Sequence, residues 1–311
     1  MREKKEIGMM KAWFLSLLMA AVLLVHPAQG LAAEPDAMAK EQLESAYKAM
    51  EDVKSGTVEL EFAVDTMFAD ASGKLNVDFS AKDAFASQGK FQMTVSDPKN
   101  PTTMEYPFYT TEDGKNYILY YQDKGKWYKD VCSKEKEAKV EKDSPAYQAL
   151  AEEMKDIDEA VRLGDGDAQQ QTYVATIDTA KFWSSFGKYV KSTMKPGDKH
   201  EKDVQEIFNI LGGMGDVEYE VTVDKATNHV VSAKADLTQP IANVMASVMS
   251  NPGIDGKTKA FVAMALTDAK LTISIKGSQY NQVSGIKIPD SVVKNAKPAP
   301  KNDKNDKKDK K

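Results

Sequence analysis

The sequence predicts an α+β protein built on one large antiparallel β-sheet. Polar and apolar residues alternate along several runs, such as 57–65 and 270–276, and a period of two is typical of strands that bury one face. Aromatic residues crowd a third stretch, 103–131. The helical patterns occur in groups between groups of strands, whereas a βαβ protein would alternate single strands with single helices.

Residues 1–33 have the layout of a secretory signal peptide. A charged start, MREKKEIGMMK, precedes an apolar run at 12–25, and small residues follow it. The apolar run is too short to cross about 30 Å of hydrocarbon as a helix. The small residues predict cleavage before Leu31 or before Glu34. We therefore expect an exported protein, located in the periplasm, in the cell envelope or outside the cell.

The cysteine count argues against a lipid anchor and against disulfides. Cys132 is the single cysteine of the chain, and no cysteine follows the apolar run where a bacterial lipoprotein would carry its lipid. One thiol cannot form an internal disulfide, so the hydrophobic core must supply the stability.

The charge distribution separates an acidic body from a basic tail. The formal net charge is -5, although residues 297–311 hold seven lysines and three aspartates. An acidic body disfavours nucleic-acid binding, since that affinity depends on neutralising phosphates. The tail lacks apolar residues beyond Ala and Pro and is predicted to be disordered. It either solubilises the protein or is attracted to an anionic envelope surface.

In the first half, an amphipathic helix at 35–53 precedes the strands. Residues 57–65, 74–86 and 90–95 alternate as strands, and 103–131 predicts three more, joined by turns at 113–114 and 124–125. Tyr117, Leu119 and Tyr121 face one side of the middle strand, and Ile118 and Tyr120 face the other. Both faces are apolar, as in a central strand of a covered sheet. With Trp127, the first three of these residues form the predicted sheet wall.

In the second half, helices and strands follow in groups. Helices are predicted at 145–162, 180–194, 201–211, 240–249 and 257–266. Strands are predicted at 172–177, 216–223, 229–237, 270–276, 280–283 and 286–289. Because no linker-like segment interrupts this pattern, we expect a single domain over residues 34–296.

Catalytic and metal-binding motifs are lacking in the sequence. Beyond the predicted signal peptide, the histidines are His200, in a charged run, and His229, in a hairpin turn. The sequence contains no Gly-x-Ser-x-Gly elbow, no phosphate-binding glycine-rich loop and no His-Glu-x-x-His. Carboxylate pairs are frequent, but they fall on predicted solvent faces. We therefore expect neither an enzyme nor a protein with a metal or cofactor.

Three features together resemble a known group of bacterial envelope proteins. They are the opening amphipathic helix, the aromatic meander ending in GKWYKD, and the closing stretch YNQVSGIKIPDSVVKNA. This combination is similar to the LolA/LppX group. The resemblance implies an open, strongly curved antiparallel sheet, or half-barrel, with helices on its concave side. Several members of the group carry acyl chains or lipoproteins between sheet and helices. This sequence departs from many relatives because it lacks their lipidated cysteine.

The resemblance and the residue pattern together indicate a candidate ligand site in the middle and late helices. Met is flexible and polarizable, so it suits adaptable apolar surfaces. The candidate cavity residues are Trp183, Phe186, Phe208, Leu211, Met245, Val248, Met249, Phe261 and Met264. These side chains either fill the core beneath the sheet or line a cavity that accepts a lipid. Two functions follow: a carrier of a lipid or lipoprotein, and an envelope scaffold with a solid core.

Overall fold

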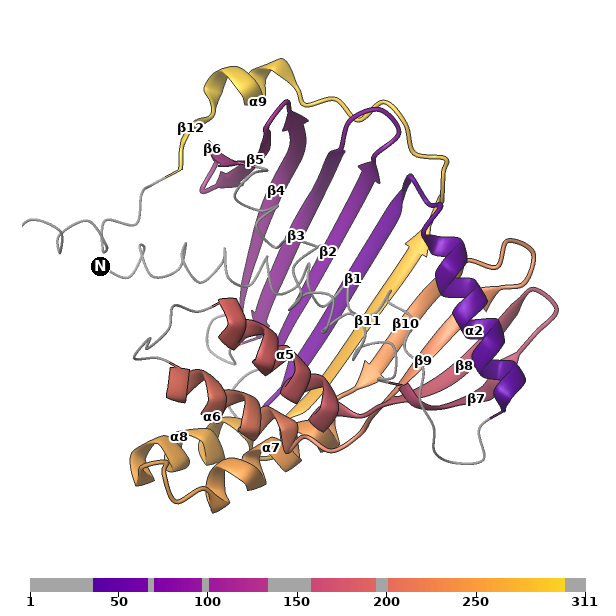
Figure 1. Ribbon diagram of the computed structural model, residues 1–311. Helices are drawn as coiled ribbons and strands as arrows, with labels where there is room; N and C mark the ends of the chain where they lie inside the picture. The colour runs from indigo at the N-terminus through magenta and orange to yellow at the C-terminus, as the bar shows by residue number, and fades with distance from the viewer. Residues whose placement is uncertain (1–35, 67–69, 97–100, 134–157, 194–200, 300–311) are drawn as a thin grey trace, which may run out of the picture.

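The computed structural model describes residues 36–66, 70–96, 101–133, 158–193 and 201–299 (Figure 1). These residues form one twelve-stranded sheet in the order β12-β6-β5-β4-β3-β2-β1-β11-β10-β9-β8-β7. All paired neighbours are antiparallel except β12 and β6, which pair in parallel. Six helices accompany the sheet in the described residues. The predicted fold class is confirmed.

The strands are β1 (Ser55–Asp65), β2 (Asp70–Ser80), β3 (Ala86–Ser96), β4 (Thr102–Asp113), β5 (Asn116–Asp123), β6 (Lys126–Ser133), β7 (Asp158–Gly166), β8 (Gln170–Ile177), β9 (Val217–Asp224), β10 (Val230–Asp236), β11 (Lys270–Ser278) and β12 (Lys297–Pro298). The helices are α2 (Ala37–Met50), α5 (Thr179–Thr193), α6 (Glu201–Gly212), α7 (Thr238–Ser250), α8 (Gly256–Leu266) and α9 (Asp290–Asn295).

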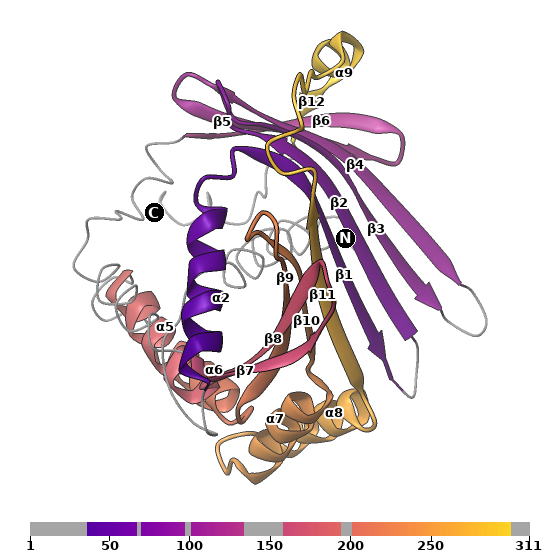
Figure 2. The same ribbon diagram turned by 90° about the vertical axis from the view of Figure 1, so that its right-hand side faces the viewer.

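The sheet curves strongly and stays open (Figure 2). Helix α2 lies on its concave side, α7 and α8 lie beyond one end of the strands, and α9 lies on the convex side. Two glycines let aromatic rings on the concave face lie directly against the backbone of the neighbouring strand. The ring of Phe62 lies against Gly73, and Phe108 Cζ lies 2.7 Å from where a Cβ of Gly89 would stand. A side chain at either glycine would hold the aromatic rings away from the sheet.

Helix α2 packs its apolar stripe onto the concave face of one half of the sheet. Asp36 caps this helix, because its carboxylate accepts hydrogen bonds from the amides of Met38 and Ala39. Leu43 and Tyr47 are buried in a cluster with β7, β8, β9 and β10. We call the space on the concave side of the sheet the trough. Helix α2 ends shortly before β1 begins, so the chain passes from the trough directly into the sheet.

The other half of the sheet buries apolar side chains on both faces, as predicted for its central strand. On the concave face, Tyr121 belongs to a cluster with Leu60 and Phe108. On the convex face, Ile118 and Tyr120 form a separate cluster with Val292 of α9. The C-terminal segment therefore covers the outer side of β5.

The helix predicted over 145–162 is wrong at its C-terminal end. Residues 158–162 belong to β7, which pairs with β8, and Val161 is 1% exposed. The apolar spacing that includes Val161 and Leu163 also fits a strand, so pairing with β8 decided the conformation. The rest of that predicted helix, residues 145–157, lies outside the described residues.

The two final strands, predicted at 280–283 and 286–289, are also wrong. Gln279 and Asn281 adopt positive φ angles of 53° and 60°, so the chain turns out of the sheet directly after β11. It continues to α9 and then to β12, where Lys297 and Pro298 of the predicted tail pair with β6. The Ala299 amide donates a hydrogen bond to the Lys129 carbonyl oxygen at 2.8 Å. The predicted signal peptide and residues 300–311 lie outside the described residues.

Candidate ligand site

Helices α5 and α6 bring three of the predicted cavity residues together. Phe208 of α6 stacks on Trp183 with ring centroids 6.0 Å apart and meets Phe186 edge-on at 5.7 Å. All three side chains are partly buried, as is Leu211 on the same helix as Phe208. The aromatic residues thus join the two helices to each other.

Helices α7 and α8 place their predicted cavity residues differently. Val248 is buried and Met245 partly buried, but Met249, Phe261 and Met264 are 45%, 64% and 50% exposed. Helix α8 (GKTKAFVAMAL) is apolar on most sides, so its sequence does not define which face turns inward. Neither of the two hollows described below includes any of the nine predicted residues.

An apolar hollow instead lies between the C-terminal end of α2 and the sheet. Its volume is about 210 Å³. We call it the α2 hollow. Helix α2 contributes Tyr47 and Met50, the concave face contributes Val58, Phe79 and Ile275, and the turn after β11 contributes Tyr280.

Two tyrosine hydroxyl groups at the α2 hollow, those of Tyr47 and Tyr280, have partners within the protein. The Tyr47 and Tyr219 hydroxyls lie 3.2 Å apart, and the Tyr280 hydroxyl donates to the Val230 carbonyl oxygen at 2.5 Å. Burial raises the pKa of Tyr280 to about 12, so this hydroxyl keeps its proton and remains a donor. Apart from Ser232 and these tyrosines, the residues that line the hollow are apolar.

Tyr280 is held in place by the turn that carries it. Its side chain lies against Gly277 and Gly56, and a Cβ at either glycine would contact it. The neighbouring Asn281 fixes the turn to the start of β1: its amide donates to the Ser55 carbonyl at 2.7 Å, and its Oδ1 accepts from the Lys54 amide at 2.7 Å. Two positive-φ residues flank Tyr280, a conformation that persists only when its surroundings fix it.

The concave face beyond the α2 hollow includes a buried hydroxyl group, that of Tyr121. This residue is 6% exposed, and its hydroxyl has no hydrogen-bond partner among the residues that the structure describes. Burial raises the pKa of this tyrosine. Of the other predicted wall residues, Leu119 packs with the same cluster and Tyr117 contacts Phe85 edge-on. Trp127 packs with the convex-face cluster, so it belongs to the outer face of the sheet.

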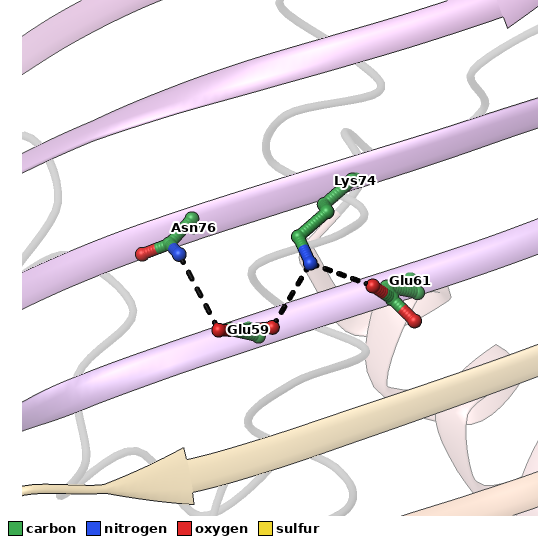
Figure 3. Close-up of polar contacts among 4 residues, drawn as sticks. All are labelled: Glu59, Glu61, Lys74 and Asn76. Atoms are coloured by element: carbon green, nitrogen blue, oxygen red, sulfur yellow. Dashed lines mark hydrogen bonds and ion pairs between the residues drawn. The ribbon is translucent and has the colours of Figure 1, made fainter.

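A second hollow, of about 360 Å³, lies on the polar face of β1, β2, β3 and β11. Lys74 lines this hollow, and its Nζ lies 2.8 Å from Glu61 and 3.1 Å from Glu59 (Figure 3). The hydrogen bond from Lys74 lowers the pKa of Glu61, and the same bond raises the pKa of Lys74. Asn76 donates to the other oxygen of Glu59 at 3.5 Å. These charges are exposed and already paired with each other.

Neither metal ligands nor a membrane-spanning helix occur in the described part of the chain. Its His, Cys, Asp and Glu side chains form no group of three or more that could hold a metal ion. Its helices include none that is both long enough and apolar enough to cross a membrane.

The described residues thus form a curved, open half-barrel whose concave face carries the two apolar clusters and the α2 hollow. A family of unknown function, DUF6612, matches residues 38–297, and the chain belongs to this family. The crystal structure of LprF from Mycobacterium bovis is similar at 13% sequence identity, covering 83% of this chain and 99% of LprF with a TM-score of 0.40. At this TM-score the superposition is too loose to transfer a site or a function. No curated protein matches the chain.

Sequence reasoning found part of the α2 hollow and missed the rest. The apolar stripe of the first helix includes Tyr47 and Met50, and an amphipathic helix of this kind must pack on an apolar surface. In the structure that surface is the concave face of the sheet. Tyr280 was assigned to a strand, although Gly277 three residues earlier was a signal for a close approach of side chain to backbone.

Proposed function

We propose that this exported protein is non-catalytic and binds an amphiphile, either a lipid or the acyl chains of a lipoprotein, in the trough of the half-barrel. The observation that carries the proposal is the α2 hollow, which opens between helix and sheet and has apolar walls. Small-molecule sites are mostly apolar concavities with few polar groups. The concave side of the sheet has both an apolar hollow and few polar groups around it.

The concave face extends the α2 hollow with further apolar surface. One row of directly opposed residues crosses six adjacent strands without a charged side chain. The row consists of Val58, Val77, Gly89, Phe108, Tyr121 and Tyr128. An aliphatic chain that enters the α2 hollow beside Val58 would continue along this row. The unpaired hydroxyl of Tyr121 offers a hydrogen bond to an ester or carboxyl oxygen of such a ligand.

Native mass spectrometry tests this function. The protein is exported by its host, purified without detergent and measured as recovered. We expect a mass adduct of lipid size that disappears after unfolding, extraction with organic solvent and refolding, and that returns when the host's lipid extract is added. A bare protein mass before and after addition of the extract would contradict the proposal.

A scaffold function is the second candidate, and the polar hollow at Lys74 is the observation that favours it. A partner protein could use the exposed carboxylates and amine on this face. Since Lys74 already pairs with Glu59 and Glu61, a partner would have to replace these contacts. Lys74→Glu would abolish crosslinking to such a partner and leave lipid adducts unchanged.

A further inference from the structure

We infer that the α2 hollow binds the end of an aliphatic chain and that Tyr280 sets how much of the chain it accepts. This inference rests on the proposed function and adds the site, the class of the bound group and the residue that determines its length. Four observations support it: the volume of the hollow, the chemistry of its walls, the position of Tyr280 and the rigidity of the turn that holds it.

The volume fits a short stretch of chain. An engineered cavity of about 150 Å³ lined by apolar side chains stays dry and binds benzene, a molecule of six carbons. By that comparison, the 210 Å³ of the α2 hollow accommodates about eight carbons. The hollow is therefore too small for a whole lipid, and most of a long acyl chain must lie outside it, along the concave face.

The chemistry of the walls favours an aliphatic chain over water molecules inside the α2 hollow. Met50, Val58, Phe79 and Ile275 present only apolar side-chain atoms. The hydroxyl of Tyr280 donates to a backbone carbonyl, which leaves Ser232 as a single small polar side chain in the lining. A water molecule in the hollow would need two to four polar partners. An aliphatic chain needs none, so it gains contacts that water would not make.

Tyr280 limits the length of this space because its ring is part of the wall and cannot move alone. The hydroxyl of Tyr280 is hydrogen-bonded to Val230, and its ring contacts His229 with centroids 5.1 Å apart. The tyrosine side chain also packs so closely on Gly56 and Gly277 that a side chain at either glycine would meet it. Asn281 ties the same turn to β1. Removing the ring would lengthen the hollow by about the size of a benzene molecule, or about six carbons.

A chain-length series tests the inference. Saturated fatty acids of 4 to 18 carbons, each below its micelle concentration, are titrated into the delipidated protein by isothermal calorimetry. Each methylene buried in the hollow should raise affinity about fourfold, which corresponds to about 0.8 kcal/mol per methylene. We expect the steep rise to end near eight carbons and continue less steeply beyond. In Tyr280→Ala the steep rise should extend by about six carbons.

Tyr280→Phe is the matched control. It keeps the ring and loses only the hydrogen bond to Val230, so its break point should stay near eight carbons. If the wild type binds the acids and Tyr280→Ala has the same break point, the inference is overturned and the proposed function stands. If the wild type binds no acid of any length, the proposed function itself fails.

A second variant covers the case in which Tyr280→Ala does not fold. Met50→Trp enlarges a partly buried side chain near the C-terminal end of α2, on the helical wall of the same hollow. It should shorten the steep part of the series by several carbons. A series identical to that of the wild type would overturn the inference.

Discussion

Replacing Tyr121 by Phe should stabilise the protein, because it removes a buried hydroxyl that has no partner. The side chain is 6% exposed, and within the described part of the chain its oxygen makes no hydrogen bond. Leaving a buried polar group unsatisfied costs about 1–3 kcal/mol. Phe keeps the ring, including its stacking on Tyr128 with centroids 5.5 Å apart. We expect the free energy of unfolding to rise by about 1 kcal/mol.

Tyr173 provides the matched control on the same face of the sheet. It is 5% exposed, but its hydroxyl donates to Gln42 Oε1 at 3.0 Å. Tyr173→Phe should therefore lower the free energy of unfolding by about 0.5–1.5 kcal/mol. Urea unfolding followed by tryptophan fluorescence on delipidated protein measures both variants. A loss of stability in Tyr121→Phe equal to that in Tyr173→Phe would refute the reasoning.

Two further predictions concern the sheet and its turns. Gly89→Ala should cost more than about 2 kcal/mol, since its Cβ would collide with the Asn76 carbonyl oxygen; Gly256→Ala, with open space around it, should change the free energy of unfolding by less than about 1 kcal/mol. Thermal unfolding separates the two, and equal effects would contradict the account of curvature. Hydrogen bonds from Thr227 lower the folded-state pKa of Asp224, so its contribution to stability is complete above about pH 4 and is lost as pH falls through the folded-state value. Asp224→Asn should flatten the acid side of a stability-against-pH curve; an unchanged acid limb would contradict this assignment.

The sheet was predictable because its signals are local. Strands β1, β2 and β9 alternate apolar and polar residues, and the turns of the meander carry Gly114 and Gly125 at positive φ, where glycine has no steric penalty. The exceptions were decided by distant contacts. Val161 fits a helical stripe and a strand equally well, and only its pairing with β8 settles the matter.

The candidate site was less predictable because it depends on how helices are placed against the sheet. The apolar residues of α8, including Phe261 and Met264, were predicted either to fill the core or to line a cavity, and both side chains are half or more exposed. Periodicity identifies an apolar stripe but not the surface it meets. The α2 hollow joins Tyr47 and Tyr280, residues 233 positions apart in the chain, and no local pattern links them.

Photo-crosslinking with an acyl chain most directly tests the claim that the trough binds such a chain at the α2 hollow. A fatty acid with a diazirine near its terminal carbon is bound to the delipidated protein and activated, and the modified peptides are identified by mass spectrometry. The account predicts adducts on the C-terminal end of α2, around Met50, and on the wall formed by Ile275 and Tyr280. Adducts confined to α7 and α8, or no adduct that an unlabelled acid can compete away, would contradict it.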